Sequence, residues 1–507
     1  MPAPYPTVKP LALVLCAACL GPWSAAGAQS QPSQRYRING QLAPQVQPNP
    51  VAGQLQQRLR QLKTELDSRA RPTTLQQAIE AALLNNPGLA EAYAQIQGSQ
   101  WNLIAVRRQW YPTLGASSNN LPQQSFNTTS GSGPQTSNTT TYENATSTGA
   151  SVTANWTFFN PSRGPAINAA SESLRQQQLL FDVTARDLVL SVQQTYFRLQ
   201  ELKQLIGSYD EILANTERQV QVIEAKFNTG LANISDVEQI RTQQYGTLST
   251  LIDTTNQLLN TAAQLAETMA LPPRSLAMPA DQLQVVGSWS ESLPATIEQA
   301  LRLREEIQSS LAAASSASWS ATRLFNTYWP TFSLGASGSV ASANSTAGYP
   351  AYTSVNRNSL NWNGGVGVGF NWQLFDGGIN AASAKASQAA SQFNLQRAAR
   401  QRLQVTREVE GAYSAYLTSQ LGVQSSSAQV QSARQAVLAA EERFSVGFTD
   451  MATVVQALNL AIQAANAYSS ALRTYNTAVA GLYRYSARWP EGSEPLLDQR
   501  TKVLRQQ

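Results

Sequence analysis

Histidine is absent from the 507-residue chain, and cysteine occurs only at Cys16 and Cys19. The absence of histidine removes the commonest general base and the commonest metal ligand from consideration. Charged residues make up only 13% of the chain, and we find no paired acids, no nucleophile with a base and no phosphate-binding glycine loop. We therefore predict that the protein is not an enzyme and that it holds no metal and no cofactor.

Net charge is also small, since 36 basic residues face 31 acidic ones and the formal balance is only +5. The basic residues are scattered among Gln, Ser and Ala. Nucleic-acid binding requires a concentrated basic surface. We therefore expect no nucleic-acid partner.

The N-terminus has the layout of a cleavable secretory signal. Lys9 precedes the apolar run Leu11–Leu20, and small residues follow at 26–28. The run is about half of the ~20 residues that a membrane-spanning helix needs, which argues against a membrane anchor. We therefore predict a signal peptide over residues 1–28 and a mature chain without cysteine. Lipidation of Cys19 is disfavoured, because the residue three positions before it is another cysteine, where a lipoprotein signal has a branched apolar residue.

The remainder of the chain contains two copies of one unit, with matching motifs in the same order. The matched segments are Ile79–Leu83 and Ile297–Leu301, Trp110–Thr113 and Tyr328–Thr331, Leu114–Ser117 and Leu334–Ser337, Asn155–Asn160 and Asn371–Asp376, Ile167–Ser171 and Ile379–Ser383, and Phe227–Gly230 and Phe444–Gly447. Chance similarity of a biased sequence does not give six ordered matches, so we infer an internal duplication.

We predict a first repeat over residues 73–294 and a second repeat over residues 295–490. A Gln- and Pro-rich extension at 29–72 precedes them and is either a linker or a segment packed as a belt around the helices, with a short helix predicted at Leu55–Leu66. A C-terminal tail at 491–507 follows.

Each repeat contains two segments in which apolar and polar residues alternate, the pattern of a strand with one apolar face. In residues 151–159, for example, four apolar side chains alternate with Ser, Thr and Asn. The segments run for about nine to eleven residues, the span of a tilted membrane strand. The Ser-, Thr-, Asn- and Gly-rich stretches between them, Ser118–Thr148 and Ser342–Asn361, are predicted to be exposed, mobile loops.

Aromatic residues crowd one end of each strand-like segment, as in the interfacial girdle of a membrane β-barrel. The girdle residues are Tyr111, Trp156, Phe158, Trp329, Trp372 and Phe375. The alternation would also suit a soluble β-sandwich, but four strands split between two distant hairpins make a poor sandwich. We therefore expect the strands to lie in lipid.

A long helix follows the strands of each repeat. In the first repeat, a nearly continuous heptad pattern runs from Phe181 to Phe227, which is typical of left-handed coiled-coil packing. The second repeat has a weaker seam that ends at Phe444 and is interrupted by two serines. A helix from near Arg163 to Phe227 would be roughly 100 Å long at ~1.5 Å per residue. Its polar residues prevent it from crossing lipid, so we expect it to project into water.

Each long helix ends in a glycine turn, Asn228–Leu231 in the first repeat and Ser445–Phe448 in the second. Glycine readily adopts the left-handed conformation that ends a helix. A second helix then begins near Asp236 or near Asp450, where an acidic side chain suits the positive end of a helix. Each repeat is therefore expected to form a helical hairpin whose tip lies far from the strands.

Together, these features resemble the TolC-like outer membrane efflux proteins over about residues 74–489. The resemblance rests on the Leu75–Pro87 segment, the Tyr111-Pro112 and Trp329-Pro330 helix-to-strand junctions, and the two glycine tips. It implies an α+β membrane protein that forms a homotrimer, in which each subunit gives four strands to one transmembrane β-barrel. A long periplasmic coiled-coil barrel of α-helices would continue this barrel, so the expected location is the cell outer membrane, in contact with its lipid.

By the same resemblance, the protein is expected to be the exit duct of a tripartite efflux or type I secretion system. It would passively conduct substrates that an inner-membrane transporter delivers through a periplasmic adaptor protein. The sequence leaves drug efflux, metal efflux and protein secretion open. The alternative is a non-channel periplasmic coiled-coil adaptor or a surface interaction protein, which would need no lipid-facing strands.

The resemblance also places adaptor docking and pore closure at the helical tips. The docking residues that it implies are Thr229, Gly230, Leu231, Val446, Gly447 and Phe448. The periplasmic constriction that it implies comprises Asp236, Asp450 and Phe444. Three copies of Asp236 around a narrow mouth would favour cations, but helix capping explains the same residue equally well. The basic latch residue expected after Gly447 is missing, because Phe448 and Thr449 stand there.

Overall fold

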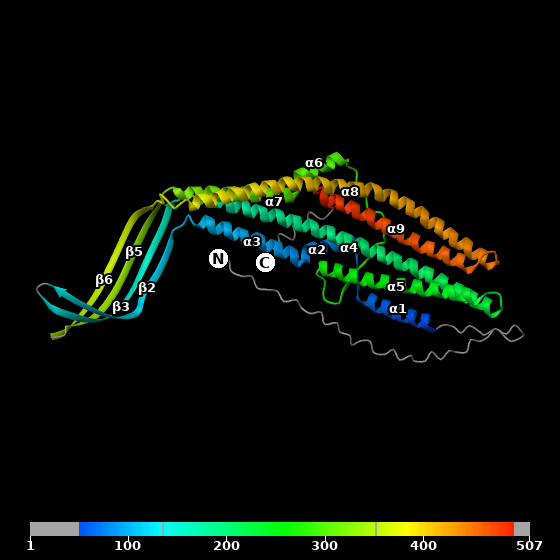
Figure 1. Ribbon diagram of the computed structural model, residues 1–507, viewed down its shortest axis with the longest axis horizontal. Helices are drawn as coiled ribbons and strands as arrows, with labels where there is room; N and C mark the ends of the chain where they lie inside the picture. The colour runs from blue at the N-terminus through cyan, green and yellow to red at the C-terminus, as the bar shows by residue number, and fades with distance from the viewer. Residues whose placement is uncertain (1–49, 134–135, 350–351, 491–507) are drawn as a thin grey trace, which may run out of the picture.

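The computed structural model describes residues 50–133, 136–349 and 352–490. The signal peptide predicted at 1–28, the first part of the 29–72 extension and the 491–507 tail lie outside these ranges. The described chain is an elongated bundle of helices with a β-sheet at one end, and the sheet bends away from the helix axis (Figure 1).

The order of elements repeats once along the chain, as the duplicated motifs predicted. The first repeat contains α2 (Leu75–Asn85), α3 (Pro87–Arg108), β2 (Thr113–Gly133), β3 (Thr136–Phe159), α4 (Arg163–Asn228) and α5 (Ile234–Thr268). The second repeat contains α6 (Leu293–Leu303), α7 (Glu305–Phe325), the 3₁₀ turn η1 (Asn326–Tyr328), β5 (Thr331–Tyr349), β6 (Tyr352–Asn371), α8 (Ile379–Ser445) and α9 (Met451–Tyr485).

Local chemistry sets where the short helices begin and end. The Thr74 hydroxyl accepts a bond from the Gln77 N–H at 3.3 Å, and the Gln77 side chain accepts from the Thr74 N–H at 3.0 Å, so the pair caps α2. Pro87 cannot continue α2. Asn86 ends that helix and caps α3, and its amide also donates to the Thr268 carbonyl at 2.8 Å. This bond holds the α2–α3 corner against the end of α5.

The two long helices match the predicted seam. α4 has 66 residues and ends one residue beyond Phe227, which confirms the predicted helix, and α8 has 67. The serines that interrupt the α8 seam, Ser419 and Ser426, are buried, and each hydroxyl donates to a carbonyl of the preceding turn, at 2.9 Å and 2.7 Å. Within the described ranges, none of the helices is long and apolar enough to cross a membrane.

The four long strands form one antiparallel sheet in the order β2-β3-β5-β6. They contain 21, 24, 19 and 20 residues, about twice the predicted length. The prediction of loops at 118–148 and 342–361 is therefore wrong; Thr148, for example, pairs with Ser342. Ladder hydrogen bonds satisfy the backbone of these polar segments without burying apolar side chains, and β-branched Thr favours an extended backbone.

The apolar core lies between the helices, and α4 is central to it, since it packs against α3, α5, α7 and α9. The largest cluster of buried side chains surrounds Tyr196 and Phe197 of α4. A second cluster fills the tips and joins Phe227 of α4 with Phe444 of α8 and Leu458 of α9. The two helical hairpins therefore share one core near their tips.

The described part of the N-terminal extension packs on the helices. It forms α1 (Pro50–Arg69), longer than the predicted Leu55–Leu66, and β1 (Ala70–Thr73). β1 pairs in parallel with β4 (Leu276–Pro279), which follows α5. Leu59 of α1 is buried against α4 and α5, and Lys63 forms a 2.8 Å ion pair with Asp210 of α4.

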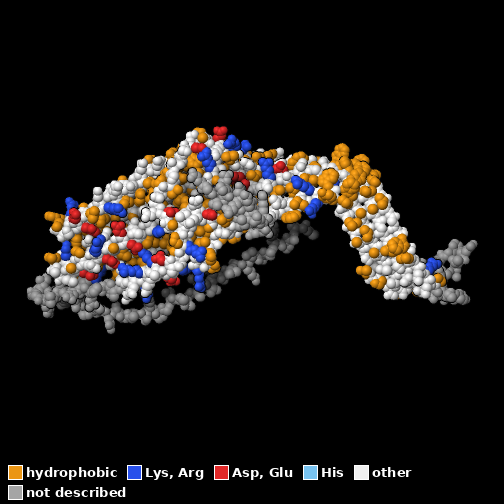
Figure 2. Space-filling model, turned by 180° about the vertical axis from the view of Figure 1, so that it is seen from behind, with side chains coloured by type: hydrophobic (Ala, Val, Ile, Leu, Met, Phe, Trp, Pro, Cys, Tyr) orange, Lys and Arg blue, Asp and Glu red, His pale blue; other side chains and the backbone are white. Residues whose placement is uncertain are grey.

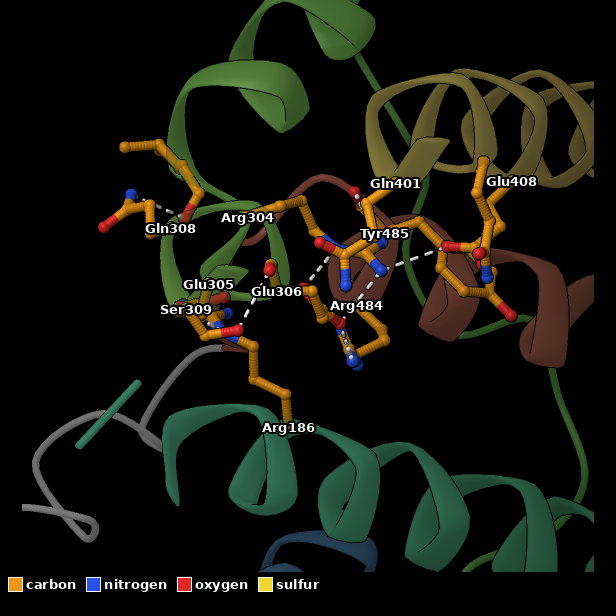
Figure 3. Close-up of polar contacts among 12 residues, drawn as sticks. Arg186, Arg304, Glu305, Glu306, Gln308, Ser309, Gln401, Glu408, Arg484 and Tyr485 are labelled. Carbon is orange, nitrogen blue, oxygen red and sulfur yellow. Dashed lines mark hydrogen bonds and ion pairs between the residues drawn. The ribbon is translucent and has the colours of Figure 1, made fainter. Parts of the chain in front are cut away.

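An ion-pair network joins the two repeats near the middle of the helices (Figure 3). Arg304, between α6 and α7, pairs with Glu306 at 2.9 Å and with Glu408 of α8 at 3.0 Å. Arg484 of α9 pairs with Glu306 at 2.6 Å and with Asp187 of α4 at 2.7 Å. Burial alone would raise the pKa of Glu306, but the bonds and charges of Arg304 and Arg484 outweigh it and lower the pKa to about 2. Glu306 is therefore ionised at neutral pH and holds both arginines.

Candidate functional site

The helix-to-strand junctions have the same geometry in both repeats. The indole N–H of Trp156 donates to the Trp110 carbonyl at 2.9 Å, and that of Trp372 donates to the Tyr328 carbonyl at 2.9 Å. Each carbonyl lies two residues before the junction proline, where the helix has ended and its last carbonyls need other partners. The two tryptophans therefore fix the strands to the ends of the helices.

The predicted girdle residues lie at the end of the sheet nearest the helices. All six are exposed in the chain: Tyr111, Trp156, Phe158, Trp329, Trp372 and Phe375. Hydrophobic side chains gather where the sheet leaves the helices, whereas charged side chains lie mainly along the helices (Figure 2). The four strands carry only two charged residues, Glu143 and Arg357, both toward the far end. Such a surface is favourable in lipid and unfavourable in water.

A further aromatic residue of β6, Trp362, was not among the predicted girdle residues, and it is 75% exposed. It precedes Trp372, the first residue after β6, by ten residues, and an even spacing along extended chain places the two side chains on the same face. Ten residues at about 3.3 Å span about 33 Å, and a tilt of about 40° gives about 25 Å along the membrane normal, the height of an apolar membrane band. The spacing of the two tryptophans therefore matches the height of such a band, and their place at its edges stays a prediction.

The opposite face of the sheet is polar. Ser117 and Ser151 of neighbouring strands lie on it with their hydroxyl oxygens 2.8 Å apart. Thr153 and Ser337, which pair across β3 and β5, have the same orientation. A polar face opposite a lipid-facing one suits a water-filled barrel interior.

The two helical tips also share one geometry. Gly230 and Gly447 have φ of +77° and +81°, the left-handed conformation that the sequence predicted. After each glycine, the next backbone N–H donates to the carbonyl five residues earlier, at 2.8 Å and 2.9 Å. The turn directs Leu231 and Phe448 outward, where they are 77% and 85% exposed. Each tip therefore presents a large apolar side chain to solvent, and the second tip also exposes Val446.

The two acidic residues of the predicted constriction both cap helices. Asp236 accepts a bond from the Asn233 N–H at 3.1 Å, at the start of α5. Asp450 accepts from the hydroxyl and the N–H of Thr453 at 2.7 Å and 3.0 Å, and these bonds hold the pKa of Asp450 below its usual value. Capping accounts for both carboxylates, and a role in a pore constriction stays a prediction. Among the described residues, no group of His, Cys, Asp or Glu could hold a metal ion.

Phe444, the third predicted constriction residue, is buried in the core that the tips share. Its neighbour Lys226 was not among the predicted tip residues. The Lys226 ammonium lies 4.4 Å from the centre of the Phe444 ring and donates to the Phe444 carbonyl at 3.2 Å. Lys226 belongs to the last turn of α4, so it ties the tip of the first repeat to the end of α8. A placement of Phe444 in the pore stays a prediction.

A sheet with one girdled apolar face and one polar face, continued by long water-exposed helices, defines a membrane channel subunit of the strand-plus-helix kind. The family model of the outer membrane efflux protein matches the chain twice, over residues 78–270 and 296–488. The chain therefore belongs to the outer membrane efflux protein family, the TolC-like channels. It is an outer-membrane efflux channel with a periplasmic helical extension, and the family is non-enzymatic.

Solved structures share this fold at low sequence identity. VceC of Vibrio cholerae is 16% identical with a TM-score of 0.64, covering 82% of this chain and 96% of that one. The CmeC channel of Campylobacter jejuni is 16% identical with a TM-score of 0.67, covering 84% and 89%. The open MtrE channel of Neisseria gonorrhoeae is 17% identical with a TM-score of 0.59, covering 82% and 89%. No curated protein sequence matches the chain.

Proposed function

We propose that three copies of the chain close into one barrel of about twelve strands and form the exit duct of a tripartite efflux or type I secretion system. The observation that carries the proposal is the open sheet. In the part of the chain that the structure describes, β2 pairs only with β3, and β6 pairs only with β5. Free strand edges do not occur in lipid, because their backbone groups would lack partners. TolC-family channels typically assemble as trimers within efflux systems.

The helices offer a second contact surface for a neighbouring copy. α8 packs against α6, α7 and α9. It also carries large apolar side chains that are exposed in the single chain: Phe393, Leu403, Leu421 and Leu438. Burial of such residues against a neighbouring subunit would stabilise the assembly by ~25 cal/mol per Å² of apolar surface.

The tips support docking of a periplasmic adaptor, which would connect the duct to an inner-membrane transporter. Leu231, Val446 and Phe448 are exposed there and offer apolar anchor points. Gly230 and Gly447, with Thr229 at the first turn, shape the loops that carry them. Substrates delivered by the transporter would pass the duct passively.

The first test combines single-channel conductance in a planar bilayer with native mass spectrometry of the purified protein. Stable pores from a species with the mass of three subunits are expected. A monomer that does not conduct would reject the duct and favour the alternative, a periplasmic coiled-coil adaptor or surface interaction protein. N-terminal sequencing should find Gln29 first, as cleavage of the predicted signal requires.

The role of Asp236 can be separated from capping by Asp236→Asn. The amide oxygen can still accept the bond from the Asn233 N–H, but the charge is removed. If Asp236 lines a narrow mouth, the cation preference of the pore falls in this variant and not in the control Asp253→Asn, on the exposed side of α5. An unchanged preference would limit Asp236 to capping.

A further inference from the structure

An open pocket of about 510 Å³ lies between α3, α4 and α7, directly below the sheet. Two arginines line it, Arg163 of α4 and Arg323 of α7. Its other polar lining comes from Asn, Gln and Ser side chains, and no carboxylate is among its lining residues. The pocket therefore has a positive charge that its own walls do not neutralise.

Arg163 is the unusual member of this lining, because it is only 3% exposed. Its Nη2 donates to the Thr157 carbonyl at 2.9 Å, and its guanidinium lies 4.4 Å from the centre of the Trp110 ring. Its Nε and Nη1 are buried and have no hydrogen-bond partner among the described residues. A buried cation with unsatisfied donors is costly unless an acceptor, preferably an anion, binds it.

The position of Arg163 in the fold points to the source of that anion. Trp110, on which it stacks, directly precedes the girdle residue Tyr111, and its carbonyl accepts the bond from the girdle residue Trp156. An aromatic girdle marks the membrane–water interface. The guanidinium therefore lies at the depth where lipid phosphates lie.

The second repeat supplies an internal comparison. In the first repeat, the matched segment that begins at Ile167 starts 12 residues after Asn155. In the second repeat, the equivalent segment starts at Ile379, only 8 residues after Asn371, so the first repeat is four residues longer here. The extra residues, 163–166, form about one additional helical turn at the start of α4. Arg163 begins this turn, so the second repeat has no counterpart of it.

The second repeat also satisfies its junction in a different way. Its carboxylate Asp376 accepts bonds from the Tyr328 hydroxyl at 2.9 Å and from the N–H groups of Gly378 and Asn380 at 2.8 Å and 2.9 Å. Asn160 stands at the matched position of the first repeat. A basic pocket therefore lies beside the junction of the first repeat, where Arg323 of the second repeat completes it, whereas the carboxylate at the junction of the second repeat is satisfied by groups of its own repeat.

We propose that the pocket binds a phosphate group and that an anionic phospholipid of the outer membrane supplies it. Arg163 and Arg323 would bind the phosphate oxygens, since arginine matches phosphate geometry and stays charged. The acyl chains would lie along the apolar girdle. One lipid would be held per chain, beside the helix-to-strand junction of the first repeat.

The test measures lipid retention by native mass spectrometry of the detergent-purified protein. Phosphatidylglycerol is compared with diacylglycerol of the same acyl chains, which lacks the phosphate. Retention of phosphatidylglycerol and not of diacylglycerol is expected. Because each variant loses a charge-assisted hydrogen bond to the phosphate, Arg163→Gln and Arg323→Gln should each bind phosphatidylglycerol roughly tenfold more weakly than the wild type. Arg108→Gln, an exposed arginine of α3 outside the pocket, should leave retention unchanged.

Competition with inorganic phosphate distinguishes a lipid phosphate from free phosphate as the ligand. If a lipid is the ligand, millimolar phosphate should displace little phosphatidylglycerol. Complete loss of phosphatidylglycerol in millimolar phosphate would reject the lipid as the source of the anion. Equal retention of phosphatidylglycerol by the wild type and both pocket variants would overturn the proposal as nonspecific lipid binding. Arg323 is exposed, so its variant carries the test even where Arg163→Gln does not fold.

Discussion

Replacement of Asp182 by Asn should stabilise the protein at neutral pH, although most substitutions destabilise proteins. Asp182 lies on α4 one turn before Arg186, whose Nε pairs with Glu305 Oε1 at 2.9 Å. Burial, with the negative charge of Glu305, raises the pKa of Asp182 to about 6, and the positive charge of Arg186 only partly opposes this. Arg186 therefore pairs with Glu305, and the ionised form of Asp182 is destabilised in the folded state.

The magnitude follows from the difference between this pKa, about 6, and the ordinary value of 3.8. One pKa unit corresponds to about 1.36 kcal/mol, so ionised Asp182 costs the folded state about 3 kcal/mol. Because the pKa is raised on folding, this cost is nearly absent below about pH 4, grows up to about pH 6 and is constant above. At about 2 cal/mol/K of unfolding entropy per residue, the substitution should raise the Tm by roughly 3 °C at neutral pH.

Thermal unfolding followed by far-UV circular dichroism, between about pH 4 and about pH 7.5, measures this effect. The gain in Tm should shrink to under about 1 °C at the acid end. Asp253→Asn, at an exposed position of α5, should shift the Tm little at any pH. A lower Tm for Asp182→Asn at neutral pH, or a gain of the same size at both ends, would refute the reasoning.

Four further changes test other parts of the fold by the same unfolding measurement. Glu306→Gln should cost about 3 kcal/mol at neutral pH, because the pKa of Glu306 is lowered on folding; this stability is present above about pH 4.5 and is lost toward about pH 2. Gly447→Ala should destabilise by about 1–2 kcal/mol at its left-handed φ, whereas Gly411→Ala, inside α8, should stabilise by about 0.5–1 kcal/mol. Trp372→Phe should cost about 0.5–1.5 kcal/mol through loss of the bond to the Tyr328 carbonyl. Equal effects of Gly447→Ala and Gly411→Ala on stability would contradict the turn geometry. An unchanged stability of Glu306→Gln or Trp372→Phe would contradict the ion pairs of Glu306 or the indole hydrogen bond of Trp372.

The features of the fold that depend on short-range sequence patterns, the long helices and their glycine turns, were predicted best. The heptad seam ended at Phe227, within one residue of the end of α4, because burial of one stripe is a property of each turn. The glycine tips were also correct, since a left-handed residue is needed wherever such a helix turns back.

Polar strands and contacts between repeats were not predictable in this way. The described residues within 118–148 and 342–361 form strands through backbone pairing, which needs no apolar side chains and so leaves little trace in hydrophobic patterning. Lys226 and the Phe444 carbonyl are 218 positions apart, and no local pattern indicates that they meet. Trp362 was detectable, because its even spacing from Trp372 is visible in the sequence.

The parallel pairing of β1 with β4 has a consequence for the order of assembly. Ala70 pairs with Leu276, so a strand near the start of the chain is completed by residues more than two hundred positions later. In a chain that crosses the inner membrane N-terminus first, β1 emerges early and must wait for nearly all of the first repeat before its partner arrives. The extra entropic cost of closing so long a loop is modest. The main consequence is therefore a delay before β1 can pair with β4. During that wait, β1 presents an unpaired edge, and a periplasmic chaperone that covers it would prevent premature pairing with other chains.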